Sequence, residues 1–197
     1  MTPDLFAELE TGKPCLQTLA LGAMLLREFA TDQAPELLAA LQPILAQAPL
    51  RQMLTPGGYT MSAAMSNCGV LGWVTDQSGY RYSPTDPQTG LPWPPMPESL
   101  RQLAVAAAST AGFSDFNPDA CLINRYDPGA RMSLHQDKDE ADLSQPIVSV
   151  SLGIPAVFLF GGLMRSDKTE KFVLKHGDVV VWGGPARWVQ VEVWDRE

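Results

Sequence analysis

The chain has 197 residues, which suits a single domain, and a formal net charge of −8. That charge argues against a protein that wraps duplex DNA, because phosphate binding depends on lysine and arginine. No apolar run approaches the roughly 20 residues that cross a bilayer, and the N-terminus has neither the basic nor the apolar region of a secretory signal. Three widely spaced cysteines (Cys15, Cys68 and Cys121) argue against a disulfide framework and favour a reducing cytosol.

The first part of the chain contains two segments that predict helices. Residues 1–23 are interpreted as a loosely structured lead-in. Residues 35–47 place leucine and isoleucine at helical spacing, and Pro43, late in the segment, is a candidate kink or end. Residues 97–111 repeat such a pattern, opening on a proline and closing on a glycine.

The remaining segments predict β-structure. Residues 49–83 have no helical period and fit short strands and loops, whereas residues 84–97 contain six prolines and predict irregular structure. The 16 glycines and 17 prolines also favour a turn-rich β protein. Five later segments, bounded by turn residues, fit strands: ACLINRY, IVSVSLG, AVFLFGG, KFVLKHG and DVVVWGG. Together they predict a mainly β, α+β fold, a sandwich or barrel with helices on one side.

A histidine and an aspartate stand two residues apart in the segment SLHQDKD. Positions i and i+2 of a strand face the same side, so His135 and Asp137 can share a metal ion. Two histidines and one carboxylate form the ligand set of non-haem Fe(II) oxygenases. Such a pair is common by chance, and the competing interpretation is a histidine that bonds a neighbouring carboxylate in a loop. His176, the only other histidine, precedes an expected turn and is interpreted as structural.

The sequence around this pair resembles the AlkB family of Fe(II)- and 2-oxoglutarate-dependent dioxygenases. Several motifs in the family's order carry the resemblance: PGGYTMS (56–62), SNCGVLGW (66–73), DPQTGLPWP (86–94), NRY (124–126), SLHQDKD (133–139), IVSVSLG (147–153), FGGLMR (160–165) and HGDVVVWGG (176–184). The resemblance extends from about residue 5 to about residue 187. It implies one domain over residues 1–197 with a double-stranded β-helix, or jelly-roll, fold.

The resemblance also implies roles for individual residues. His135 and Asp137 would be two of the three iron ligands and the catalytic pair, and Asn124 and Tyr126 would bond 2-oxoglutarate. The implied substrate contacts are Trp73, which would stack on a flipped base, with Tyr80, Tyr82, Asp139 and Arg165. Without the family pattern, the same tryptophan would be a core or loop aromatic, the tyrosines half-exposed strand residues and the aspartate one more acid of a charged loop.

The C-terminal end departs from the family pattern. By spacing, Val191 stands where the family has its third iron ligand, a histidine, and Glu192 is only a weak substitute. Neither Arg187 nor Arg196 matches the arginines that bind the cosubstrate carboxylate. The jelly roll is therefore expected to lack its last strand and to expose a neighbouring edge, which the alternating, unmatched tail of residues 188–197 is a candidate to cover. An altered reading frame near residue 187 would explain the change, and sequencing the locus tests it.

The function implied by the resemblance is the oxidative removal of alkyl groups from bases such as 1-methyladenine and 3-methylcytosine, as direct-reversal DNA repair. The reaction would use Fe(II), 2-oxoglutarate and O2. The expected partner is alkylated single-stranded DNA, with RNA and double-stranded DNA as further candidates, and the protein is expected to be a cytoplasmic monomer. Three alternatives stay open: a lesion-binding remnant without turnover, which the missing histidine and arginine favour, a small-molecule dioxygenase on the same fold, and an unstable fragment.

Overall fold

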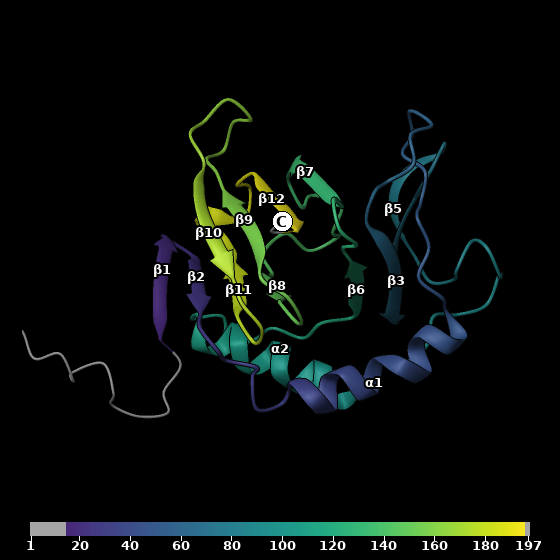
Figure 1. Cartoon of the computed structure of the whole chain (residues 1–197), viewed down its shortest axis with the longest axis horizontal. Coiled ribbons are helices and arrows are strands. Elements are labelled where there is room, and N and C mark those ends of the chain that lie inside the picture. Colours follow the sequence, from purple (N-terminus) through teal and green to yellow (C-terminus); the bar gives the residue numbers. More distant parts are fainter. Residues whose placement is uncertain (1–14, 196–197) are drawn as a thin grey trace, which may run out of the picture.

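The computed structural model describes residues 15–195, which form two facing four-stranded sheets with two helices on one side (Figure 1). No helix among these residues is long and apolar enough to cross a membrane. The elements in chain order are β1 (Leu16–Ala20), β2 (Ala23–Leu26), α1 (Ala34–Gln47), β3 (Ala64–Gly69), β4 (Gly72–Asp76), β5 (Gly79–Ser83), α2 (Glu98–Thr110), β6 (Ala120–Arg125), β7 (Arg131–His135), β8 (Ile147–Val150), β9 (Ala156–Phe160), β10 (Glu170–Leu174), β11 (Val179–Trp182), the short 3-10 helix η2 (Gly184–Ala186) and β12 (Val191–Asp195).

The strands pair antiparallel throughout. One sheet has the order β1-β2-β11-β8 and the facing sheet the order β10-β9-β12-β7. Two two-stranded ribbons, β3–β6 and β4–β5, lie to one side of the two sheets (Figure 1). This is the mainly β, jelly-roll architecture with helices on one side that the sequence predicts.

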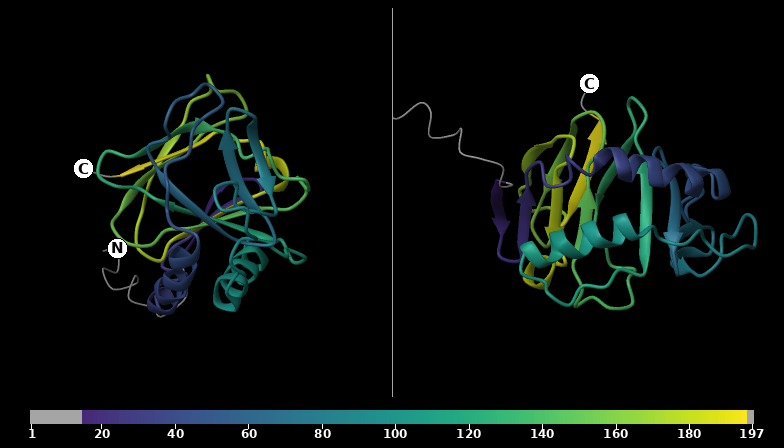
Figure 2. Two further views of the ribbon diagram at one scale, coloured as in Figure 1. Left: turned by 90° about the vertical axis from the view of Figure 1, so that its right-hand side faces the viewer. Right: turned by 90° about the horizontal axis from the view of Figure 1, so that it is seen from below.

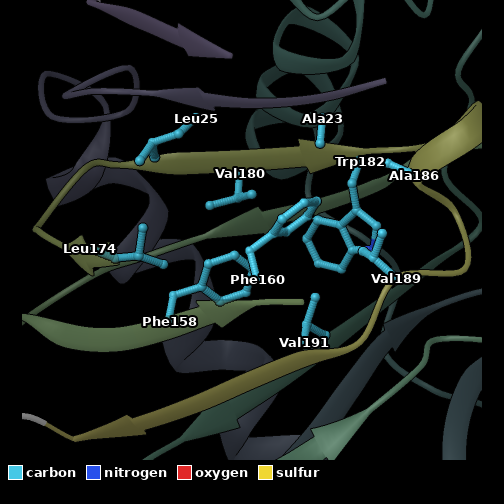
Figure 3. Close-up of a cluster of buried hydrophobic side chains, with 10 residues drawn as sticks. All are labelled: Ala23, Leu25, Phe158, Phe160, Leu174, Val180, Trp182, Ala186, Val189 and Val191. Atoms are coloured by element: carbon cyan, nitrogen blue, oxygen red, sulfur yellow. The ribbon is translucent and has the colours of Figure 1, made fainter. Parts of the chain in front are cut away.

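Strand β11 lies in the middle layer of three, between the facing sheet on one side and the helices on the other. All four of its residues are buried, because apolar side chains alternate between two apolar environments. Val180 and Trp182 point into the core between the sheets, where they meet Phe158 and Phe160 (Figure 3). Val179 and Val181 contact the two helices instead. A strand with no polar face therefore marks the centre of the molecule.

Helices α1 and α2 cover the outer face of the β1-β2-β11-β8 sheet, as Figure 2 shows from below. Leu37 of α1 and Leu103 and Ala107 of α2 are almost fully buried against Val179 and Val181. Full burial of one leucine stabilises the fold by about 1.5–3 kcal/mol, so this contact holds the helices to the sheet. Both helix predictions are confirmed, and so are the five later strands.

Two details of the sequence interpretation are wrong. Within the predicted lead-in, β1 and the start of β2 form a hairpin, whereas residues 1–14 lie outside the described part of the chain. The turn needs Gly22, whose φ is +83° and whose added Cβ would lie 2.4 Å from the carbonyl oxygen of Gly183. The hairpin is held by β11, about 150 residues away along the chain, so no local pattern reveals it. Of the two roles considered for Pro43, ending the helix is wrong, because α1 continues to Gln47, whereas the kink stays a prediction.

The tail forms a regular strand. β12 lies between β9 and β7 and pairs with both, so the sheet that carries His135 is continuous. Within residues 15–195, β8 pairs only with β11 and β6 only with β3. Over the residues that the structure describes, the tail therefore pairs within the β10-β9-β12-β7 sheet and forms no pairing with β8 or β6.

Candidate functional site

His135 is the last residue of β7, and Asp137 follows in the loop beyond it. The ring Nε2 atom of His135 lies 3.5 Å from the Asp137 carboxylate, and both side chains are only half-buried. The other ring nitrogen, Nδ1, lies 2.8 Å from the carbonyl oxygen of Ser133. A carbonyl only accepts, so Nδ1 carries a proton, and Nε2, the nitrogen beside the aspartate, is the one left to bind a metal ion, the arrangement typical of a metal-binding histidine.

The same contacts shift the proton affinity of the imidazole. Burial lowers the pKa of His135, but the hydrogen bond and the negative charge of Asp137 outweigh burial and raise the pKa above its ordinary value. In the absence of a metal ion, Asp137 therefore favours the protonated imidazole. A bound cation would replace this proton between the two side chains.

A β-bulge directs His135 into the molecule. Val193 of β12 pairs with Met132 and Val191 pairs with His135, so two residues of β7 oppose one residue of β12. The bulge brings His135 to the same face as Met132, although His135 is three positions, an odd number, further along the chain. Directly opposed side chains share a face, and Val191 is buried in the core between the sheets (Figure 3). His135 therefore faces the interior with a valine directly opposite.

The donor set is incomplete for an Fe(II) site with three protein ligands. His135 and Asp137 supply two donors, but no group of three histidines, cysteines or acids within residues 15–195 could hold a metal ion. Val191, opposite His135, has no donor atom. The buried Nε1 atom of Trp182, in the same core cluster, has no hydrogen-bond partner among the described residues and could donate to a bound carboxylate or water. The residues present thus do not fit the complete iron centre.

An aromatic pair lies on the β4–β5 ribbon beside the loop that carries Asp137. The rings of Trp73 and Tyr80 stack with centroids 5.6 Å apart and an interplanar angle of 21°. The indole Nε1 of Trp73 donates a 2.9 Å hydrogen bond to Asp139. This bond ties the aromatic pair to a carboxylate two residues beyond Asp137, so the structure brings together three of the implied substrate contacts.

Tyr82 makes a second link between the ribbon and the loop. Its hydroxyl donates a 3.1 Å hydrogen bond to Glu140. Burial, followed by the negative charge of Glu140, raises the pKa of Tyr82 well above its ordinary value, so the phenol stays protonated and remains a donor. Glu140 is absent from the sequence-based set of site residues, because it reads as one more acid of a charged loop.

The remaining implied contacts are placed less uniformly. Burial, and then the charge of Asp137, raises the pKa of Tyr126, whose ring packs against the core cluster that contains Met65 and Val74. Asn124 is exposed on β6 and makes no side-chain hydrogen bond to another described residue. Arg165 is exposed but donates a 2.6 Å hydrogen bond to the carbonyl oxygen of Leu134, next to His135. Thus Arg165 bonds the backbone next to His135, whereas the implied roles of Asn124 and Tyr126 stay predictions.

Two further candidates have other partners. Glu192 follows Val191 on β12, so its side chain points to the opposite face, where it pairs with Arg131. It is therefore not a third metal ligand. His176 is exposed and accepts a 3.0 Å hydrogen bond from the backbone N–H of Gly153, which is consistent with the structural interpretation.

Arg187 is the functional candidate that sequence reasoning missed. It is one of the largest fully buried side chains, 1% exposed, and its guanidinium contacts the loop that follows Asp137. One signal could have revealed it: residues 179–191 are apolar or small apart from this arginine and one glutamine. A lone buried charge must find partners, because an unpaired one is strongly destabilising.

Comparisons with known proteins agree on one family. Residues 22–190 match the family model of the 2OG-Fe(II) oxygenase superfamily. The chain is 60% identical to the alpha-ketoglutarate-dependent dioxygenase AlkB of Escherichia coli (strain K12) over 184 residues. The aligned residues make up 93% of this chain and 84% of that protein. It is 58% identical to AlkB of Salmonella typhimurium over the same shares. The solved structure of OsALKBH1 superposes with a TM-score of 0.79 and 28% identity, covering 93% of this chain and 88% of that chain. This chain therefore belongs to the 2OG-Fe(II) oxygenase superfamily and, within it, to the AlkB dioxygenases.

Proposed function

We propose that this protein recognises N-alkylated bases of the 1-methyladenine and 3-methylcytosine type in nucleic acids and removes the alkyl group as direct-reversal repair. The observation that carries the proposal is the stacked Trp73–Tyr80 pair, bonded to Asp139 two residues beyond Asp137. In the net reaction, 2-oxoglutarate and O2 are consumed. Succinate and carbon dioxide form, the alkyl carbon leaves as an aldehyde, and the base nitrogen is released from its alkyl group.

The site's chemistry favours a damaged base over a normal one. An aromatic platform such as Trp73 stabilises a stacked base by about 1–3 kcal/mol. The Trp73 indole occupies one carboxylate oxygen of Asp139, which leaves the other free to accept from an exocyclic amine. A carboxylate also attracts the positive charge of an N-alkylated ring. Flipping costs least for a base that already pairs poorly, which adds to this selectivity.

The cofactor side of the proposal rests on fewer residues. His135 and Asp137 would hold Fe(II), and Asn124 and Tyr126 would contact 2-oxoglutarate. Val191 opposite His135 favours a second candidate function, in which the protein binds the lesion without turnover. We further propose that alkylated single-stranded DNA is the preferred partner, ahead of RNA and duplex DNA, and that the protein acts as a monomer in the cytoplasm.

A repair assay tests the first function against the second. Purified protein is incubated with Fe(II), 2-oxoglutarate, ascorbate and an oligonucleotide carrying one 3-methylcytosine, and the repaired base is counted. We expect repair above that of His135→Ala. The lesion strand should also bind more tightly than the unmodified strand in a fluorescence anisotropy titration. Binding without repair would leave only the lesion-binding function, and absence of both would refute the proposal.

A further inference from the structure

The loop of residues 136–146, which carries Asp137, has no helix or strand of its own, so its shape depends on contacts with other elements. Arg187, just after η2, supplies three of them. Its guanidinium donates to the carbonyl oxygen of Asp137, to the carbonyl oxygen of Gln145 at 3.2 Å, and to the carboxylate of Glu140 at 2.6 Å. One side chain therefore contacts the start, the middle and the end of the loop.

The chemistry of this contact requires arginine. A guanidinium presents several donors in a fixed plane, so it can satisfy three acceptors that point from different directions. Each acceptor here bonds a different guanidinium nitrogen, whereas a lysine would have to reach all three from one ammonium nitrogen. Arg187 is 1% exposed, so water does not compete for these donors. The loop is thus fastened to the interior of the protein.

The contact continues from the loop into the β4–β5 ribbon. Glu140 accepts from Arg187 through one carboxylate oxygen and from the Tyr82 hydroxyl, at 3.1 Å, through the other. Tyr82 lies directly opposite Trp73 in the ribbon, so the chain of contacts ends at the aromatic platform. Through Glu140, the arginine connects the backbone of a metal-binding residue with the surface proposed to receive the base.

We propose that Arg187 is a positioning residue. Through Glu140 and Tyr82, it fixes Asp137 and the aromatic platform at Trp73 relative to each other. The substrate part of this inference rests on the proposed function, whereas the positioning part does not. Arg187 touches neither base nor metal; it acts by holding the loop that carries Asp137 against the ribbon that carries the platform.

Hydrogen–deuterium exchange of the intact protein tests the positioning. In Arg187→Met, we expect exchange to rise at least tenfold in residues 136–146 and in β5, with β9, β10 and both helices unchanged. Arg27→Met is the matched control, because it breaks an ion pair with the buried Asp178, and within the described chain neither residue bonds the loop. It should leave exchange in the loop unchanged. Equal exchange in the loop of wild type and Arg187→Met would overturn the proposal.

Two further variants keep the test decisive. Glu140→Gln removes the ion pair with Arg187 but keeps an amide oxygen that can accept from Tyr82. It should therefore raise exchange in the loop less than Arg187→Met does. If Arg187→Met does not fold, Glu140→Gln alone provides the test. A rise in exchange spread over the whole protein in both variants would assign Arg187 a merely structural role. In binding titrations, the ratio of affinities for the lesion strand and the unmodified strand should be about tenfold smaller for Arg187→Met than for wild type. If wild type shows no preference, the proposed function fails, whereas the exchange result still decides the role of Arg187.

Discussion

Replacing Val191 with histidine is expected to give the metal site a third donor. The register places residue 191 directly opposite His135, with both side chains on the inner face of the sheet. Opposed residues of an antiparallel pair have Cβ atoms about 4.5–5.5 Å apart, a separation at which two imidazoles can bind one ion. Two histidines and Asp137 would then form the facial set of non-haem iron sites.

The magnitude follows from the energetics of metal sites. A four-ligand zinc site contributes about 10–16 kcal/mol, so one ligand contributes roughly 3 kcal/mol. At about 1.4 kcal/mol per tenfold, the expected gain in metal affinity is about 100-fold. Val191 is 2% exposed in a packed core, so the larger imidazole should lower the free energy of unfolding of the metal-free protein by about 1–3 kcal/mol. Added metal should restore that stability.

Isothermal titration of the metal-free protein with Mn²⁺ measures the affinity, and thermal unfolding with and without Mn²⁺ measures the stability. Val193→His is the matched control. It introduces the same side chain on the same strand face, about 7 Å further along and opposite Met132. If Val191→His binds Mn²⁺ no more tightly than wild type, or if Val193→His gains as much, the register argument is refuted.

Three further predictions concern other parts of the molecule. Arg51→Gln should lower the free energy of unfolding by about 3 kcal/mol, measured by urea denaturation, because it leaves the buried Asp86 carboxylate uncompensated; Arg81→Gln, which breaks an exposed pair, should leave that free energy nearly unchanged. By NMR, Asp76 should titrate with a pKa of about 2, because the Arg81 guanidinium stabilises its carboxylate. The small stabilisation of the β4–β5 hairpin is then complete above the ordinary value of 3.8 and is lost as the pH falls toward 2; in Arg81→Gln the pKa should shift less, because only the hydrogen bonding of Ser78, chiefly through its backbone N–H, still lowers it. Trp73→Ala should weaken lesion-strand binding by about tenfold in anisotropy titrations, corresponding to roughly 1.4 kcal/mol of lost stacking; unchanged affinity would remove this residue from the site.

Local patterns predicted most of the secondary structure. The helix over residues 35–47 was predictable because its buried face gives apolar residues at helical spacing. Strand β11 was predictable because burial on both faces gives a short continuous apolar run. Both patterns fit within a short stretch of sequence. The β1–β2 hairpin was not predictable, since β2 depends on β11 for its partner. Long-range pairing of this kind leaves no local signature.

The candidate site was predictable in part, for a similar reason. His135 and Asp137 are close in sequence, so spacing alone could bring them together. The bond from Trp73 to Asp139 spans 66 residues, and the bond from Arg187 to Glu140 spans 47. Family resemblance assigned both residues of the first contact to the substrate without pairing them, and the second contact was not predicted.

The place of β12 in its sheet has a consequence for biosynthesis. β7 and β9 are separated in space by a strand that is translated after both of them. At about 5–20 residues per second, roughly 2–7 s pass on the ribosome between the completion of β9 and that of β12. During that interval the two strands that flank β12 each lack their common neighbour. The nascent chain therefore exposes two strand edges that other chains can pair with, and chaperone binding during these seconds would protect the sheet that carries His135.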